Sequence, residues 1–426
     1  MLEKLFALKA NGTTARTEIV SGLTIFFTMA YILFVNPKIL SAAGMDQGAV
    51  FMATCLAAAI TTLAMGFYAN LPVALAPGMG QNAYFAFTAV PLLAGDWRLA
   101  LGCVFISGTL FVAISASPAR EALLNAIPAS QKHAIAGGIG FFLAMIGFQG
   151  AGMIAASPET LVRPGNLADP KFLIAAFGLL VIAALWARKV TGAVLIGILA
   201  ATALAMATGL QAPPSLSVPP PSIAPTLLQM KFTGAPFDAL AAVVFVFLFL
   251  NLLDASGTLT AVGRQAGLIE NGKLRNGRKG LITDAGGTMV GAALGTSPVT
   301  AYIESAAGAG GRTGLVAVTV GLLFLASLVL APLAGAVPAY ATAPALVFVA
   351  VLFAKELKEI KWSDVTEALP ALVTALAIPL TFSIAEGIGL GFLAYGAIKL
   401  MTGRWREVSA GVVIVAIAFI AKVAAE

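Results

Sequence analysis

The sequence predicts an all-α polytopic membrane protein with fourteen transmembrane segments in two inverted seven-span repeats. Three observations lead to this fold class. Apolar residues make up 59% of the 426 residues and charged residues only 10%, whereas a soluble domain is about a quarter charged. The apolar residues gather in fourteen stretches, and a membrane helix needs roughly 20 such residues. The second half of the chain also resembles the first.

The predicted spans follow one another closely, and most are apolar on all sides, as expected of helices surrounded by lipid or other helices. They cover residues 18–40, 48–68, 71–90, 98–117, 134–154, 171–187, 190–209, 237–256, 280–296, 298–310, 313–334, 340–354, 366–383 and 385–401. A last apolar stretch, 409–423, is either an interfacial helix or a fifteenth span. Residues 1–17 lack the pattern of a cleaved signal peptide and are predicted to be a cytoplasmic N-terminus.

The basic residues support this layout. If the N-terminus is cytoplasmic and the spans alternate, 19 of the 25 Lys and Arg residues, Lys399 and Arg404 among them, fall on the cytoplasmic side. This asymmetry is typical of multi-pass membrane proteins. It supports fourteen spans with a cytoplasmic N-terminus, and it explains the net charge of +6 without nucleic-acid binding.

The two halves are joined by a proline-rich segment, residues 210–236, which is predicted to be an external linker. A shift of 218 positions places Asn36 on Asp254, and residues 82–84 (Asn-Ala-Tyr) on residues 300–302 (Thr-Ala-Tyr). Because seven is odd, the second half must enter the membrane upside down. Inverted repeats of this kind are typical of secondary transporters.

Two of the fourteen segments are interrupted. One contains APGMGQNAYFAF (76–87), and the other follows LGTSPVT (294–300). Non-helical backbone at membrane depth must be buried in protein or line a cavity. Both segments are third in their repeat, and interrupted segments at matching positions indicate a binding site.

Three carboxylates lie in apolar surroundings near these segments: Asp254, Asp284 and Glu304. A charge at the bilayer centre costs roughly 2.5–3.5 kcal/mol, so such residues mark substrate or proton pathways. The chain has a single histidine, His133, and two cysteines, Cys55 and Cys103, inside apolar runs. No metal site, cofactor site or nucleophile–base pair follows from these residues, so we expect no enzyme.

Four phrases of the sequence are distinctive in combination: TARTEIVSGLTIFFTMAYILFVNP (14–37), APGMGQNAYFAF (76–87), DASGTLTAVGRQAGL (254–268) and GTSPVTAYIESAAGAGGRTGL (295–315). With these phrases the sequence resembles the nucleobase permeases (the xanthine/uracil permease superfamily), and in particular the adenine/guanine/hypoxanthine permease branch. The likeness runs from about residue 10 to 405.

The resemblance implies a core domain of spans 1–4 (18–117) and 8–11 (237–334), and a gate domain of spans 5–7 (118–209) and 12–14 (335–426). It also implies short strands in spans 3 and 10 that meet at the substrate. The partners it implies are a purine base, a coupled proton, the lipid bilayer and a second copy of the chain in a homodimer, with no nucleic acid and no cofactor.

The predicted substrate-binding residues lie on the two broken segments and on span 8. They are Asn82, Ala83, Tyr84, Phe85, Asp254, Thr258, Thr300, Ala301, Tyr302, Ile303 and Glu304. Proton coupling is predicted at Asp284, Glu304 or Asp254. Uracil permeases have Glu at the position of Asp254 and His at that of Thr258, so this chain fits the purine branch better.

The predicted function is therefore import of adenine, guanine or hypoxanthine by proton symport, with the core domain moving against the gate domain. Xanthine, uracil or an inorganic anion on the same scaffold, or a channel, are the alternatives. The preferred base, proton against sodium coupling, and the oligomeric state stay open at this point.

Overall fold

The computed structural model describes residues 2–117, 126–214, 220–270, 273–308 and 310–425. Within these residues the chain is mainly helical, with three short two-stranded sheets. Close packing divides the chain into two compact units. The first comprises Met1–Ser117 and Ala168–Ala345, and the second comprises Pro118–Leu167 and Leu346–Glu426.

These boundaries place α10 (Pro170–Ala187) and α11 (Ala193–Ala207), the predicted spans 6 and 7, in the first unit. The resemblance assigns both spans to the gate domain. Packing within one conformation does not determine which helices move together, so the division into core and gate domains stays a prediction.

Nine helices in the described part of the chain are long and apolar enough to cross a membrane. They are Ala15–Ser41, Gln47–Ala69, Trp97–Ala116, Ala129–Gly150, Pro170–Ala187, Phe237–Gln265, Gly314–Leu333, Ala339–Glu359 and Ile384–Met401. Three shorter apolar helices cover Ala193–Ala207, Val365–Leu380 and Ala410–Ile420. A polytopic helical membrane protein is thus confirmed, whereas the count of fourteen spans and the inverted repeat stay predictions.

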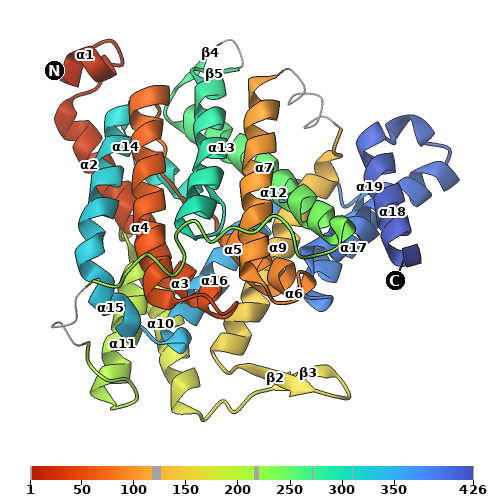
Figure 1. Cartoon of the computed structure of the whole chain (residues 1–426), viewed down its shortest axis with the longest axis horizontal. Helices are drawn as coiled ribbons and strands as arrows, with labels where there is room; N and C mark the ends of the chain where they lie inside the picture. The colour runs from red at the N-terminus through yellow and green to blue at the C-terminus, as the bar shows by residue number, and fades with distance from the viewer. Residues whose placement is uncertain (1, 118–125, 215–219, 271–272, 309, 426) are drawn as a thin grey trace. The chain divides into compact units, whose positions relative to one another are not determined.

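In the first unit, α14 (Gly314–Ala326) packs against α2 (Ala15–Met29) and α4 (Gln47–Ala64), and these three helices are neighbours in Figure 1. Their contact requires glycine. A Cβ atom on Gly314 would lie 2.0 Å from the carbonyl oxygen of Gly66, which lies in the π-helical turn η1 (Met65–Ala69) that follows α4. Small residues allow this close approach of two backbones in a membrane.

A second group of helices in the first unit is centred on α13 (Gly277–Leu294). It packs against α7 (Trp97–Ala116) and α4, and α7 also packs against α12 (Phe237–Gln265). The other elements of this unit are α1 (Leu2–Phe6), α3 (Ile32–Ser41), α6 (Val90–Leu92), β4 (Ile269–Glu270), β5 (Lys273–Leu274), η4 (Ser327–Leu330), α15 (Ala331–Ala336) and the first residues of α16 (Ala339–Ala354).

Side-chain caps explain where several helices begin. Asp46 accepts a hydrogen bond from the N–H of Ala49 (2.7 Å) at the start of α4, and Asp96 accepts from the N–H of Arg98 (2.9 Å) at the start of α7. Glu18 on α2 caps a different helix. Its carboxylate accepts from the N–H groups of Arg312 (2.9 Å) and Thr313 (3.0 Å), just before α14. These carboxylates occupy the end of a helix where unpaired N–H groups favour negative charge.

The two broken segments meet as predicted. The first contains β1 (Leu75–Pro77), α5 (Met79–Tyr84) and the π-helical turn η2 (Phe85–Ala89); the second contains β6 (Val299–Ala301) and the 3-10 helix η3 (Ile303–Ala307). Strands β1 and β6 pair antiparallel, with Leu75 opposite Ala301 and Pro77 opposite Val299. Neither segment can continue as a helix, because Pro77 and Pro298 supply no N–H and favour extended backbone before them.

The proline-rich linker is not a free connection. Leu228 donates its N–H to the carbonyl of Ala293 (2.7 Å), and Lys231 donates its N–H to the carbonyl of Arg98 (3.0 Å). The Lys231 ammonium also pairs with Asp96 at 2.8 Å. Partial burial raises the pKa of Asp96, but the Lys231 ammonium and the Arg98 N–H outweigh it, so the pKa is below its ordinary value. The linker is thereby fixed to the ends of α7 and α13.

The second unit packs α17 (Val365–Leu380) between α9 (Ala129–Gly150) and α18 (Ile384–Met401). Its other elements are the hairpin β2 (Ile154–Ser157) and β3 (Leu161–Pro164), η5 (Lys355–Glu359), η6 (Trp405–Glu407) and α19 (Ala410–Ala425). Helix α19, the predicted last apolar stretch, packs against α18. Its role as a span or as an interfacial helix stays open.

Lys399 is buried at the end of a helix. The charge distribution counts it on the cytoplasmic side, at the end of the predicted span 385–401, and it lies in the last turn of α18 with no exposed side-chain surface. Its ammonium pairs with Glu367 on α17 (2.6 Å) and with Glu407 (2.8 Å). The bonds from Arg404 and then Lys399 lower the pKa of Glu407 to about 2. The end of the second unit is therefore held by a charged network, which the sequence did not reveal.

Candidate functional site

Side chains from neighbouring helices hold the paired strands in place. The Thr62 hydroxyl lies 2.9 Å from both the N–H and the carbonyl of Leu75. Ser305 accepts the N–H of Ala74 (3.0 Å), and the Ala74 carbonyl accepts the N–H of Tyr302 (3.0 Å). Inside a bilayer every backbone polar group needs a partner within the protein. These bonds supply partners where the helical pattern is interrupted.

Asp284 is attached to strand β6. It is fully buried on α13 and accepts the N–H of Ala301 at 2.7 Å and the hydroxyl of Thr300 at 3.2 Å. The sequence made this residue one of three candidates for proton coupling. The geometry shows a carboxyl that fixes the position of β6 relative to α13.

Asp254 and Glu304 lie on two elements that pack together, α12 and η3. They are close enough to interact electrostatically. Asp254 accepts a long hydrogen bond from Thr258 (3.4 Å), one turn further along α12. Glu304 accepts from the hydroxyl of Tyr31 at 2.8 Å. Each carboxylate has two oxygens and several acceptor positions, and the bonds from Thr258 and Tyr31 leave further acceptor positions on both.

The residues of the first broken segment are buried, except Phe87, which is half-buried. Asn82 accepts a hydrogen bond from Ser297 (2.5 Å), and the same hydroxyl approaches the amide oxygen of Asn36 (3.3 Å). The Tyr84 ring contacts the Phe247 ring edge to face, with centroids 4.8 Å apart. Through this ring contact, the first broken segment packs against α12, the helix that carries Asp254.

Two of the predicted backbone contacts are already used within the protein. The N–H of Ala301 donates to Asp284, and the N–H of Tyr302 donates to Ala74. The Tyr302 hydroxyl donates to the carbonyl of Pro77 at 2.5 Å. Ile303 differs from the others, since its side chain is 45% exposed within this structure. In this conformation the side chains of Asp254 and Glu304 are therefore better placed for recognition than the backbone of β6.

Three buried polar side chains of the first unit were not predicted from the sequence, and one of them, Tyr31, bonds to Glu304. Tyr31 lies in the quoted phrase FFTMAYILF but was not singled out, because a tyrosine in an apolar run is ordinarily part of the core. Gln81 and Asn251 are buried, and neither atom of either amide has a hydrogen-bond partner among the described residues. The signal for Asn251 was present, since it is a lone amide in the run FVFLFLNLLD.

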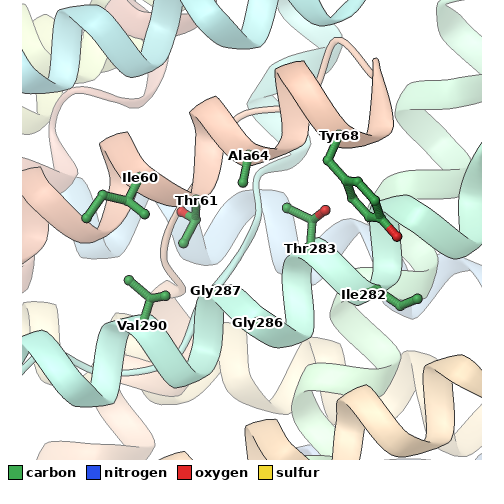
Figure 2. A pocket seen from close by; sticks show the side chains of 9 residues that line it. All are labelled: Ile60, Thr61, Ala64, Tyr68, Ile282, Thr283, Gly286, Gly287 and Val290. Atoms are coloured by element: carbon green, nitrogen blue, oxygen red, sulfur yellow. The ribbon is translucent and has the colours of Figure 1, made fainter.

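Two cavities in the first unit lie outside this constellation. Figure 2 shows the larger, an open groove of about 270 Å³ between α4 and α13 whose lining carries no charged side chain. Its lining residues are Ile60, Thr61, Ala64, Tyr68, Ile282, Thr283, Gly286, Gly287 and Val290. The second, of about 240 Å³, borders η3 and includes Gln265, Ser305 and Arg312. Among the described residues no group of His, Cys, Asp and Glu could hold a metal ion.

The chain is similar in sequence to known permeases. Residues 16–390 match the model of the Permease family (Xan_ur_permease). The chain is 46% identical over 426 residues to the adenine permease AdeP of Escherichia coli, covering 99% of this chain and 96% of the relative. It is 43% identical over 425 residues to the guanine/hypoxanthine permease PbuO of Bacillus subtilis, covering 97% of this chain and 98% of the relative.

A solved structure has the same fold. The transmembrane domain of the cyanobacterial bicarbonate transporter BicA superposes with a TM-score of 0.67 at 14% identity, over 88% of this chain and 97% of that domain. At this identity the likeness concerns the architecture alone. Together with the apolar helices and the family match, it identifies the chain as a multi-pass membrane protein.

Proposed function

Because the chain belongs to the Permease family, we propose that it transports purine bases across a membrane by proton symport. Membership of this family, with adenine and guanine/hypoxanthine permeases as relatives, makes it a transporter rather than an enzyme. The names of the relatives support a purine base as substrate. The coupled proton, the direction of transport and the mechanism of access are our proposal.

The observation that supports this function best is the position of Asp254 and Glu304 beside the paired strands. Both are carboxylates with unused acceptor positions, next to backbone that is not helical. Purine bases carry ring and exocyclic N–H groups, which such acceptors bind. Tyr84 and Phe85 would contact the ring, and one of the carboxylates would take up the coupled proton as the base binds.

We assign different roles to the three carboxylates. Asp254 and Glu304 would contact the base. Asp284 would position β6, because its oxygens already accept the bonds of Thr300 and Ala301. This assignment makes Glu304 or Asp254, rather than Asp284, the residue that couples to the proton. In the proposed cycle a core domain moves against a gate domain and exposes the site to each side in turn.

The matching cellular arrangement is also a proposal: a homodimer in a bacterial inner membrane with the N-terminus in the cytoplasm. A reporter fused to the C-terminus tests the topology. Fourteen spans place the reporter inside the cell, and a fifteenth span at 409–423 places it outside.

The function is tested by uptake of labelled adenine, guanine, hypoxanthine and uracil into cells that lack their own permeases. We expect uptake of at least one purine, and we expect a protonophore to abolish it. Asp254→Asn and Glu304→Gln should eliminate uptake without reducing the amount of protein in the membrane. Uptake of uracil alone would favour the pyrimidine alternative, and uptake that is insensitive to the protonophore would remove the symport mechanism.

A further inference from the structure

Asn251 has no hydrogen-bond partner although it is fully buried. Its exposed fraction is 0%, and neither its amide nitrogen nor its amide oxygen is bonded to any residue that the structure describes. An unpaired amide in an apolar environment is costly, and lipid offers no substitute for water. An apolar side chain would avoid that cost, so the presence of an amide requires an explanation.

The position of Asn251 on α12 explains why an amide is present there. Phe247, Asn251, Asp254 and Thr258 are spaced by four, three and four residues, so they share one face of the helix. Phe247 contacts the rings of Tyr84 and Phe85, with centroids 4.8 and 6.3 Å apart. At a rise of about 1.5 Å per residue, Asn251 is about 4.5 Å along the axis from Asp254. It therefore lies between the aromatic contact and the first carboxylate.

Ser256 on the same helix provides a comparison, because burial of an unpaired group does not by itself indicate contact with the substrate. Its hydroxyl is also buried and unpaired among the described residues. However, Ser256 follows Asp254 by two residues and so lies about 200° around the helix from it. Only Asn251 combines an unpaired buried group with the face that carries Asp254.

The two carboxylates cannot supply the hydrogen-bond donor that an amide supplies. Ionised carboxylates only accept hydrogen bonds, whereas a purine also has ring nitrogens that need a donor. The N–H groups of Ala301 and Tyr302 are already engaged. An Asn side chain donates and accepts side by side, which matches a ring nitrogen next to an N–H group, as in the pairing of Asn with adenine.

We propose that Asn251 contacts the transported base directly, donating from its amide nitrogen to a ring nitrogen and accepting a neighbouring N–H with its oxygen. This inference rests on the proposed function, since it requires that the substrate is a purine base. It adds to the two carboxylates a donor that selects among bases by the position of their ring nitrogens.

The test compares the wild-type protein with Asn251→Ala and Asn251→Leu, and with Ser256→Ala as the matched control. Uptake of the preferred base is measured in competition with its deaza analogues, each of which has one ring nitrogen replaced by C–H. We expect the wild type to disfavour one analogue by about tenfold, the usual effect of one lost hydrogen bond. Both Asn251 variants should have a KM for the natural base raised by about tenfold or more and should lose that discrimination. Ser256→Ala should behave as the wild type.

Retained discrimination with an unchanged KM in Asn251→Leu would overturn the proposal, because a structural amide would give that result. If Asn251→Leu does not reach the membrane, Asn251→Ser provides the same comparison with a smaller polar side chain. Absence of purine uptake by the wild type refutes the proposed function itself. Purine uptake with normal discrimination in the variants refutes only the role of Asn251.

Discussion

The role of Asp284 is open to a direct test, because positioning and proton coupling predict opposite outcomes. In Asp284→Ala the N–H of Ala301 and the hydroxyl of Thr300 lose their acceptor, and both donors are buried. A buried donor without a partner costs about 1–3 kcal/mol, so the substitution should cost about 2–6 kcal/mol. Folded proteins are stable by only about 5–15 kcal/mol. We therefore expect a large loss of stability and displacement of β6.

Asp284→Asn provides the matched comparison. The amide keeps one oxygen, which can still accept the shorter bond from Ala301 (2.7 Å), so we expect a loss of only about 1 kcal/mol. The midpoint of thermal unfolding in detergent should fall by about 2–4 °C for each kcal/mol. Purine uptake by Asp284→Asn should persist at a reduced rate and should remain sensitive to a protonophore.

The opposite pattern would refute this reasoning. If Asp284 carries the coupled proton, Asp284→Asn should abolish proton-driven uptake while leaving the unfolding midpoint unchanged. An unchanged midpoint in Asp284→Ala would likewise show that the bonds to β6 contribute nothing to stability.

Three further predictions concern hydrogen bonds and charges found only in the structure. Tyr31→Phe removes the hydroxyl bond to Glu304 (2.8 Å). We expect about a tenfold rise in the KM for the base, with little change in the unfolding midpoint. A normal KM would exclude this bond from substrate binding. Lys399→Met leaves the largely buried carboxylate of Glu367 without its counter-ion and should destabilise the protein by about 3–5 kcal/mol. Lys399→Met combined with Glu367→Gln should recover much of that loss in thermal unfolding, and equal stability of the single and double variants would contradict the pairing. The pKa of Glu407 in the folded protein is lowered to about 2. Its contribution to the stability of the folded state is therefore present above the unfolded pKa of about 4.3 and is lost as the pH falls towards 2. The difference in unfolding midpoint between the wild type and Glu407→Gln should therefore shrink below about pH 4, whereas a constant difference from pH 6 to 3 would rule out this linkage.

The broken segments are the part of the site that the sequence predicted best. Pro77 and Pro298 interrupt two apolar stretches at matching places in the two halves, and the strands that result do pair, with Pro77 opposite Val299. This could be foreseen because proline and glycine act through local backbone geometry. Unpaired backbone N–H and carbonyl groups are costly in a bilayer, so those of the two segments must be bonded within the protein.

The partners of individual polar groups could not be foreseen in this way. Asp254, Asp284 and Glu304 are equally conspicuous as carboxylates in apolar sequence, yet only Asp284 accepts two bonds from β6. Glu18 caps a helix that begins almost 300 residues later in the chain. Lys399 was predicted at the cytoplasmic end of a span, but nothing in the sequence indicated that its ammonium is buried between Glu367 and Glu407. A hydrogen bond depends on positions in space, which residues distant in sequence reach only after folding.

The sequence by itself determined the membrane class, the interrupted segments and the short set of carboxylates that are candidates for binding. Composition and backbone preference are local properties. A charged residue or a helix-breaking residue within an apolar segment is costly in a bilayer, so each one stands out in the sequence. The tertiary structure decided which of these groups are already paired and which keep free capacity. Asp284 is engaged by strand β6, whereas Asp254 and Glu304 keep further acceptor positions and the amide of Asn251 has no partner among the described residues. That distinction arises from contacts between distant elements, and on it rests our proposal of which residues position the site and which bind the substrate.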